Sequence, residues 1–215
     1  MDPGQDRESE DVLEFVKVNA FLGDFHRLMS WEGFAENAIE SQREHLENLQ
    51  IDIGGKAYSG REVYDFEEIA NDFPRLLRYS LVVLVDSVVV AKLRHLCNVG
   101  AQRAGKVKRY EDINEGNEVD RARWFLGEIL NARIEGSAID WDLISKLRAF
   151  RNCIVHEAGK CNESRVASWG AHARQLEWKR GEVIVRPGYC RWIAEKALGL
   201  VEGLIKENRP HLDPY

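Results

Sequence analysis

Arg151, Asn152 and His156 form a short stretch whose residue types and spacing suit chemistry on a phosphate. Arginine donates two parallel hydrogen bonds to a phosphate and stays charged. Histidine exchanges protons near neutral pH because its unperturbed pKa is about 6.5. Strand breakage in RNA without a metal needs a base for the 2′-hydroxyl proton, an acid for the leaving 5′-oxygen and a cation for the charged phosphorane. Asparagine can hold the phosphate or orient the histidine.

The segment that carries these residues has the pattern of an amphipathic helix. Apolar residues recur at helical spacing at Leu143, Leu147, Phe150 and Ile154. Asp140 is a candidate N-cap, and Gly159 is a plausible stop beyond the last turn. We therefore expect a helix from Trp141 that ends close to His156.

The spacing within the motif constrains any shared site. Arg151 and His156 are five residues apart, which is roughly 140° around an ideal helix. Asn152 and His156 do share a face, at i and i+4. A site that uses all three residues therefore requires a break in the helix near His156 or a second chain.

The sequence Arg151-Asn152-Cys153-Ile154-Val155-His156 resembles the motif of the HEPN superfamily, an arginine followed by a polar residue and a histidine at the end of a bundle helix. The resemblance covers residues 74–160, with weaker support from the C-terminal helix. It implies an antiparallel helical bundle and a metal-independent endoribonuclease, a toxin or antiphage effector without cofactor. Arg151, Asn152 and His156 would be its catalytic residues.

The same resemblance implies particular partners. HEPN nucleases are typically homodimers, so two copies of Arg151 and His156 would surround one phosphate of an RNA substrate. An antitoxin or immunity protein is a further expected partner. Some HEPN toxins carry a tyrosine two residues after the histidine, which their antitoxin modifies. This chain has Ala158 there, so that mode of neutralisation does not carry over.

Asp86 is a lone carboxylate inside a strongly apolar run, 74–97, which we expect to form a central helix. A buried carboxylate is costly unless it is paired or hydrogen-bonded. In proteins with the HEPN motif an acidic residue on this helix often faces the motif, so the resemblance pairs Asp86 with Arg151 or His156 in a supporting role. A purely structural salt bridge with the same partners is the alternative.

The distribution of charge favours anion binding in the second part of the chain. Residues 1–75 hold 7 Lys/Arg against 18 Asp/Glu, a net charge of −11, whereas residues 76–215 hold 23 against 18, a net charge of +5. Such charges can also be simply solvated. The candidate RNA contacts are Arg148 and Lys160 beside the motif, and Arg103, Lys106, Lys108 and Arg109 in the connector 102–117.

The remaining pattern predicts a mainly α protein with a small β-hairpin before the last helix. We expect a disordered tail at residues 1–10, an N-terminal helical arm at 11–60 and a HEPN-like helical domain at 61–209. The arm, which is not part of the minimal bundle, reads as two helices, with Ser30 as N-cap of the second. Further helices are expected at 65–72, 118–133 and 187–208, and alternation across Arg180-Gly181 predicts the hairpin at 175–186.

Composition narrows the class of protein. The four cysteines form no Cys-x-x-Cys pair, which suits free thiols in a reducing cytoplasm. The apolar run 81–91 is interrupted by Asp86 and is too short to span a bilayer. The N-terminus lacks the pattern of a signal peptide, and five of the histidines are scattered without metal-ligand spacing. We expect a soluble cytoplasmic protein without a metal site.

Three alternatives stay open at this stage. The chain could be a non-catalytic HEPN-like helical module that binds RNA, a nucleotide or a partner protein, with the Arg-His pair structural. It could also be a helical interaction protein in which the motif occurs by chance. Finally, Cys161 could act as a thiol nucleophile beside His156, although no third group is placed to orient the base. Trp169, Trp178 and Trp192 could stack on bases, but we expect them to be packed.

Overall fold

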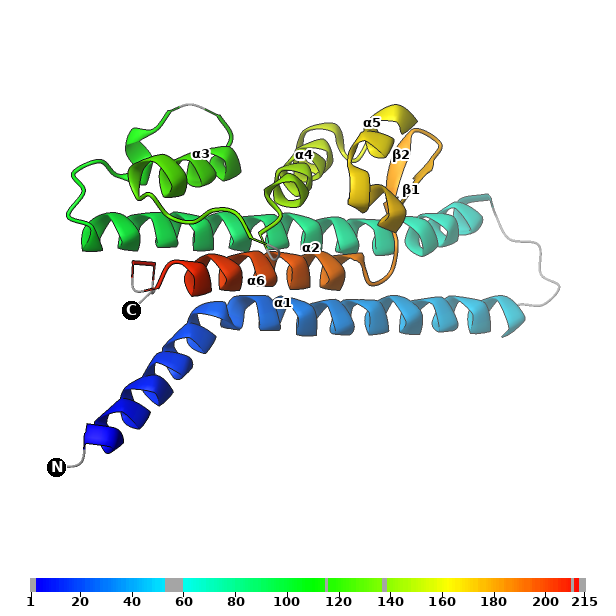
Figure 1. The fold of residues 1–215 in the computed structure, drawn as a ribbon. Coiled ribbons are helices and arrows are strands. Elements are labelled where there is room, and N and C mark those ends of the chain that lie inside the picture. Colours follow the sequence, from blue (N-terminus) through cyan, green and yellow to red (C-terminus); the bar gives the residue numbers. More distant parts are fainter. Residues whose placement is uncertain (1–2, 53–59, 115, 137–138, 210, 213–215) are drawn as a thin grey trace.

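The computed structural model describes residues 3–52, 60–114, 116–136, 139–209 and 211–212. Within these ranges the chain is mainly helical, with a two-stranded antiparallel hairpin before the last helix, as the sequence predicted. Three helices, α1 (Pro3–Asp52), α2 (Gly60–Arg103) and α6 (Tyr189–Glu207), run side by side, with α1 antiparallel to the other two (Figure 1).

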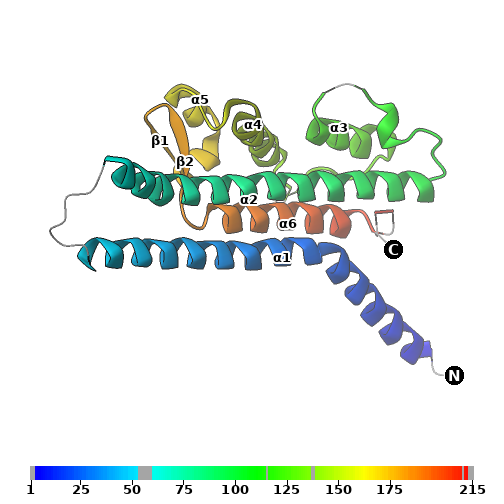
Figure 2. The same ribbon diagram turned by 180° about the vertical axis from the view of Figure 1, so that it is seen from behind.

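The shorter elements cover the side of α2 that faces away from α1 (Figures 1 and 2). They are α3 (Glu118–Trp124), α4 (Trp141–Glu157), α5 (Glu163–Ser168), β1 (Leu176–Lys179) and β2 (Glu182–Val185). Short 3-10 helices occupy Tyr110–Asp112 and Gly170–Gln175, and a π-helical turn occupies Phe125–Ile129. No helix in the described ranges is long and apolar enough to cross a bilayer.

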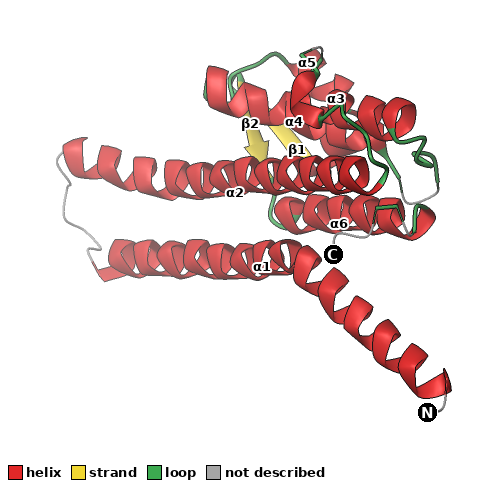
Figure 3. Ribbon diagram, turned by 90° about the vertical axis from the view of Figure 1, so that its left-hand side faces the viewer, coloured by secondary structure: helices red, strands yellow, loops and turns green. Residues whose placement is uncertain are grey.

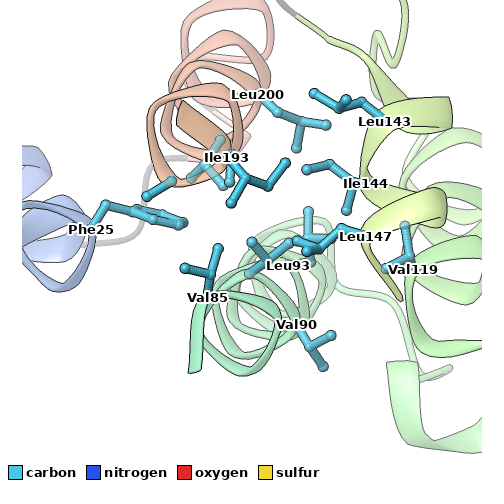
Figure 4. Packing of buried hydrophobic residues seen from close by; sticks show 14 of the residues in the cluster. Phe25, Val85, Val90, Leu93, Val119, Leu143, Ile144, Leu147, Ile193 and Leu200 are labelled. Carbon is cyan, nitrogen blue, oxygen red and sulfur yellow. The ribbon is translucent and has the colours of Figure 1, made fainter. Parts of the chain in front are cut away.

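One hydrophobic cluster joins the long helices to α4. Figure 4 shows Phe25 of α1 pointing toward α2 and α6, with Leu147 of α4 and Leu93 of α2 meeting on the other side of the cluster. All four of the predicted inward positions of α4, Leu143, Leu147, Phe150 and Ile154, are buried. Removing such a side chain costs about 2–5 kcal/mol, so this packing fixes α4 on the body of the protein.

α1 differs from the predicted N-terminal arm. Residues 3–10, predicted to be a disordered tail, belong to one helix that continues to Asp52, and its N-terminal part bends away from the rest of the protein (Figure 3). Ser30 is no cap, because its hydroxyl donates to the carbonyl of His26 at 3.1 Å within the helix. From Phe21 onward α1 contributes to the common core, so the predicted boundary between 11–60 and 61–209 divides residues that pack together.

α2 also merges two predicted elements. The sequence predicted one helix at 65–72 and a new one at Pro74, but a single helix runs from Gly60 to Arg103. A proline inside a helix removes one backbone hydrogen bond. Here it is accommodated where the following turns pack through Tyr79 and Val82. The glycine pair predicted to end the arm, Gly54-Gly55, lies outside the described residues.

The segment after the basic connector is less regular than predicted. α3 ends at Trp124 and passes into the π-helical turn, whereas one helix was expected over 118–133. Val119, Ala122, Phe125 and Leu126 take the buried positions. The helical pattern over 118–133 favours an inward Trp124, whereas the structure leaves 44% of its surface exposed.

The hairpin closes with the predicted two-residue turn. Lys179 pairs with Glu182, and Arg180 and Gly181 both have positive φ, +54° and +85°. Two positive φ values define a type I′ turn, whose twist matches that of paired strands. The turn therefore fixes the register in which β1 pairs with β2.

His172 fastens the first turn of α4 to α6. Its imidazole is fully buried between the carbonyl of Leu143, 2.8 Å from Nε2, and the hydroxyl of Tyr189, 2.7 Å from Nδ1. Burial disfavours the charged ring and lowers the pKa of His172. The unfolded chain takes up a proton near the ordinary histidine pKa while the folded chain resists it, so this part of the stability is present above that pKa and is lost as the pH falls below it.

The melting temperature of the wild type should therefore fall between pH 7.5 and pH 5, and His172→Gln should reduce the size of that fall. The comparison is made by thermal denaturation followed by circular dichroism. His26→Gln, at an exposed histidine, serves as the control and should keep the pH dependence of the wild type. Identical pH dependence in wild type and His172→Gln would contradict the role of His172.

Candidate functional site

The centre of the site is a buried charge cluster between α2, α3 and α4. The side chain of Asp86 is 1% exposed and accepts a hydrogen bond from Arg148 of α4. Arg148 also donates to Glu118 at the start of α3. Burial raises the pKa of Asp86, and the guanidinium groups of Arg148 and Arg151 oppose that rise. The cluster therefore ties three helices together beneath the motif.

These contacts confirm one predicted pairing and correct another prediction, because Asp86 does form an ion pair with Arg151. The ion pair joins Arg151 Nε to the Asp86 carboxylate at 3.7 Å, and the closer contact, a hydrogen bond, comes from Arg148, which the sequence did not pair with Asp86. Arg148, predicted to contact RNA, is instead enclosed by two carboxylates with 18% of its side chain exposed. The reason is spacing, because Arg148 and Arg151 lie one turn apart on α4 and both reach toward α2.

Arg151 retains hydrogen-bonding capacity. Its Nη1 donates to Asn152 Oδ1 at 3.1 Å, and its Nε is buried without a hydrogen-bond partner among the described residues. The side chain is 23% exposed, so part of it reaches the protein surface while Nε stays buried. Asn152 thus holds the arginine in one orientation, and the outer part of the fork is available for an anion.

His156 lies on the last turn of α4 and is exposed. The helix continues to Glu157, so the break that would bring Arg151 and His156 together within one chain is absent. One face of α4 carries a stripe of polar residues at intervals of four, Arg148, Asn152 and His156. Val155 lies beside this stripe with 46% of its surface exposed. The exposed part of the motif therefore presents one apolar side chain, Val155, and one polar side chain, His156, to solvent.

The end of α4 is tightly specified by its sequence. Ala158 and Gly159 both adopt left-handed backbone, and the Gly159 amide donates to the Cys153 carbonyl at 3.1 Å, as in a Schellman cap. A Cβ at Gly159 would overlap the hydroxyl of Tyr79. That hydroxyl in turn donates to the carbonyl of Val183. Only glycine fits this position.

The hairpin braces the segment that follows the motif. The amide of Val183 donates to the Gly159 carbonyl at 3.0 Å, and the amide of Cys161 donates to the Gly181 carbonyl at 3.0 Å. These bonds extend the sheet by a short third segment through Lys160. The last turn of α4, which carries His156, is therefore held by α2 and by the hairpin.

The predicted RNA contacts fall into two separate places. Lys160 is exposed directly after α4, near the motif in sequence. Arg103, Lys106, Lys108 and Arg109 lie at the far end of α2, where Arg103 is 17 residues beyond Asp86. At 1.5 Å per residue this is about 25 Å along the helix. The fold therefore does not bring the basic connector to the motif.

The cysteines are unsuited to nucleophilic catalysis. The thiol of Cys153 donates to the carbonyl of Lys160 at 3.8 Å, and burial raises the pKa of Cys153 to about 12. Burial also raises the pKa of Cys161. Because the thiolate is the nucleophile, raised pKa values leave little of the reactive form near neutral pH. Cys97 and Cys190 are free and buried, as expected for core thiols.

The other candidate residues have structural roles. Trp169 is packed against Phe150, with ring centroids 5.0 Å apart. Trp192 packs on His172, and Trp178 donates to the Cys161 carbonyl at 2.8 Å while 39% of its surface stays exposed. No group of three His, Cys, Asp or Glu residues suited to a metal was found among the residues that the structure describes.

Sequence reasoning missed the two residues that complete the support of the site. Glu118 lies 30 residues before its partner Arg148, and Tyr79 lies 104 residues before Val183. Neither has a spacing that marks it. The available signal for Glu118 was its place in the first turn of a helix, and this position alone does not identify a partner.

No protein-family model matches this chain, and neither the curated proteins nor the solved structures compared with it gave a match.

Proposed function

We propose that this chain is a metal-independent endoribonuclease of HEPN type that acts as a toxin or antiphage effector in the cytoplasm. The observation that carries the proposal is the pairing of Arg151 with Asn152 on a rigidly capped helix whose exposed last turn bears His156. An oriented guanidinium and an exposed imidazole are the groups that strand breakage at a phosphodiester requires.

The proposed reaction follows from these groups. His156 takes the proton of a 2′-hydroxyl, whose oxygen attacks the adjacent phosphorus. Arg151 stabilises the negative charge of the phosphorane, and Asn152 keeps the guanidinium oriented. The bond from phosphorus to the 5′-oxygen breaks, and a second histidine protonates the leaving oxygen. The products are a 2′,3′-cyclic phosphate and a 5′-hydroxyl, and no metal ion takes part.

A homodimer supplies the second histidine. Arg151 and His156 point about 140° apart on a continuous helix, so one chain cannot hold a phosphate from both sides. A two-fold axis near Asn152 and His156 would bring both copies of each residue to one cleft. Val155, exposed beside the stripe, and the outer face of α2 are suited to the contact. An antitoxin or immunity protein would bind the same face.

Mixing Arg151→Ala chains with His156→Ala chains tests the shared site. Neither parent should cleave RNA. Random mixing makes half of the dimers hybrid, and each hybrid keeps one Arg151 and one His156, from opposite chains, in its single cleft. Cleavage should therefore return above the level of either parent, but it should stay well below the wild-type value because the second histidine is missing. Cleavage of a labelled RNA is measured after co-refolding, with each parent alone as control.

A mixture as inactive as its parents would contradict a cleft in which Arg151 of one chain serves His156 of the other. A monodisperse monomer with full activity, detected by light scattering under the assay conditions, would remove the dimer from the proposal altogether.

A non-catalytic helical module is the second candidate, and the charge cluster favours it. Asp86, Arg148 and Glu118 satisfy one another and join three helices without any ligand. Arg151 could belong to the same structural cluster, since its Nε lies 3.7 Å from Asp86. In that case the protein would bind RNA, a nucleotide or a partner protein, and RNA would be retained without being cut.

A further inference from the structure

The C-terminal end of α2 forms a second cationic surface away from the motif. Arg103, Lys106, Lys108 and Arg109 place four cationic side chains within seven residues, and all four residues are exposed. The turn that carries them is ordered by the end of the helix. Gly105 has φ +60°, and the Lys106 amide donates to the Ala101 carbonyl at 2.9 Å. This cap turns the chain back on itself, so the cationic groups occupy a defined position.

Two hollows flank Lys106. One, of about 580 Å³, is lined by Asn98, Gln102, Lys106, Arg109 and Glu111 together with Ala101. The other, of about 400 Å³, lies between the end of α2 and the segment that follows the π-helical turn, and Lys106 and Arg103 both line it. Because Lys106 lines both hollows, it can contact an extended ligand that occupies the two of them.

Lys106 and Arg109 are the two cations that line the larger hollow. Neither Lys106 nor Arg109 forms an ion pair with any residue of the described ranges, in contrast to Arg148 in the buried cluster. Glu111 is the acidic residue of the larger hollow. Its carboxylate accepts a hydrogen bond from Asn98 at 3.1 Å, which lowers its pKa. Two cations beside one carboxylate leave net positive charge at this position even though Arg109 also acts on Glu111, and net positive charge favours an anion.

An aromatic group extends this surface toward the motif. The ammonium of Lys108 lies over the ring of Trp124, 5.0 Å from its centroid, and 44% of Trp124 is exposed. α3, which ends at Trp124, lies beside α2 on the same side as α4 (Figure 1). Cations that alternate with an exposed aromatic ring are typical of surfaces that bind single-stranded nucleic acid. A membrane surface is less suited, because only Val107 projects an exposed aliphatic side chain from the turn.

We propose that the turn formed by residues 103–109, with Lys106 and Arg109 as its principal contacts, binds the phosphodiester backbone of the same single RNA strand whose cleavage we assign to Arg151 and His156. This inference rests on the proposed function for the identity of the strand. The separation of about 25 Å along α2 between Asp86, which lies beside Arg151, and Arg103 corresponds to about seven phosphates at ~3.4 Å per nucleotide of a helical strand. Affinity should therefore depend on RNA length, and a trinucleotide cannot reach both surfaces.

The test uses binding rather than cleavage, so it remains informative if the chain is not a nuclease. Full-length His156→Ala protein is compared with the same protein carrying Lys106→Glu and Arg109→Glu, using fluorescence anisotropy of labelled 12-nucleotide and 3-nucleotide single-stranded RNAs. The charge reversal should weaken binding of the 12-mer by about tenfold or more and reduce the slope of log affinity against log salt by about 1.4, since each phosphate contact on a single strand contributes about 0.7. Binding of the 3-mer should not change.

A matched control is available on the hairpin. Lys179→Glu with Arg180→Glu makes the same change of charge at exposed residues near the other end of α2 (Figure 1). It should leave binding of the 12-mer within about twofold of the parent. Equal losses from both double variants, an equal loss for the 3-mer, or no binding of either RNA by the parent would overturn the proposal. So would binding of the parent to phosphatidylserine vesicles but not to RNA.

The outcomes separate this inference from the nuclease. Length-dependent binding that is lost in Lys106→Glu/Arg109→Glu, in a protein whose wild type does not cut RNA, supports the second surface and removes the nuclease. A wild-type protein that cuts RNA, with the same KM for a 12-mer after the charge reversal, keeps the nuclease and removes the second surface.

Discussion

Replacing His156 with alanine should lower the rate of RNA cleavage by about 10²–10⁴-fold, the usual contribution of a general acid or base. The fold should survive, because His156 is exposed on the last turn of α4 and the cap of that helix is built by Gly159 and the Cys153 carbonyl. The measurement is the rate of cleavage of a labelled RNA in EDTA, with the melting temperature recorded for the same samples.

Arg151→Ala should cause a parallel loss of about 10²–10³-fold, the usual effect of removing one donor to a charged transition state. Arg151→Lys should restore only part of the rate, because an ammonium group cannot reproduce the planar fork that Asn152 orients. His26→Ala, at an exposed histidine on α1, is the matched control and should cleave like the wild type. Wild-type rates in Arg151→Ala or His156→Ala would contradict the assignment.

Asp86→Ala should lower the free energy of unfolding by about 3 kcal/mol, toward the low end of the range for removing one partner of a buried ion pair. The carboxylate is 1% exposed and lies against two guanidinium groups, so its loss leaves buried positive charge without compensation. The loss stays at the low end because Arg148 keeps its contact with Glu118. Urea denaturation followed by circular dichroism gives the free energy directly.

Two companion variants separate charge from packing. Asp86→Asn keeps an acceptor for Arg148 and should lose less stability than Asp86→Ala. Glu118→Ala should cost less again, because the Glu118 side chain is 28% exposed and its charge is partly solvated. A Glu118→Ala loss larger than that of Asp86→Ala would show that the cluster depends on α3 rather than on the buried carboxylate.

The parts of the fold that sequence reasoning predicted are those with strong local signals. α4 combines a 3.6-residue apolar period with an N-cap, and Asp140 does accept from the Leu143 amide at 2.9 Å. The hairpin combines alternation with a turn that requires positive φ, and α6 carries an apolar face throughout its length. In each case local propensity and burial favour the same structure.

The parts that were not predicted depend on contacts distant in sequence. α1 has sparse apolar positions, and its continuity from Pro3 follows no local pattern that we recognised, while its burial from Phe21 onward depends on α2 and α6. Pro74 favoured a boundary, but packing of the following turns keeps α2 continuous. In the site, the positions of Arg151 and His156 on one helix could be read from spacing. The capture of Arg148 by Asp86 and Glu118 could not, because it joins residues 62 and 30 positions apart.

The central claim is that Arg151 and His156 cut RNA by attack of the 2′-hydroxyl, and the chemistry of the product ends tests it most directly. RNA is incubated with wild-type protein in EDTA, and the ends of the fragments are identified by mass spectrometry, with His156→Ala protein in parallel. We expect 2′,3′-cyclic phosphate and 5′-hydroxyl ends from the wild type and no fragments from His156→Ala. Fragments with 3′-hydroxyl and 5′-phosphate ends, or the same fragments from His156→Ala, would contradict the account.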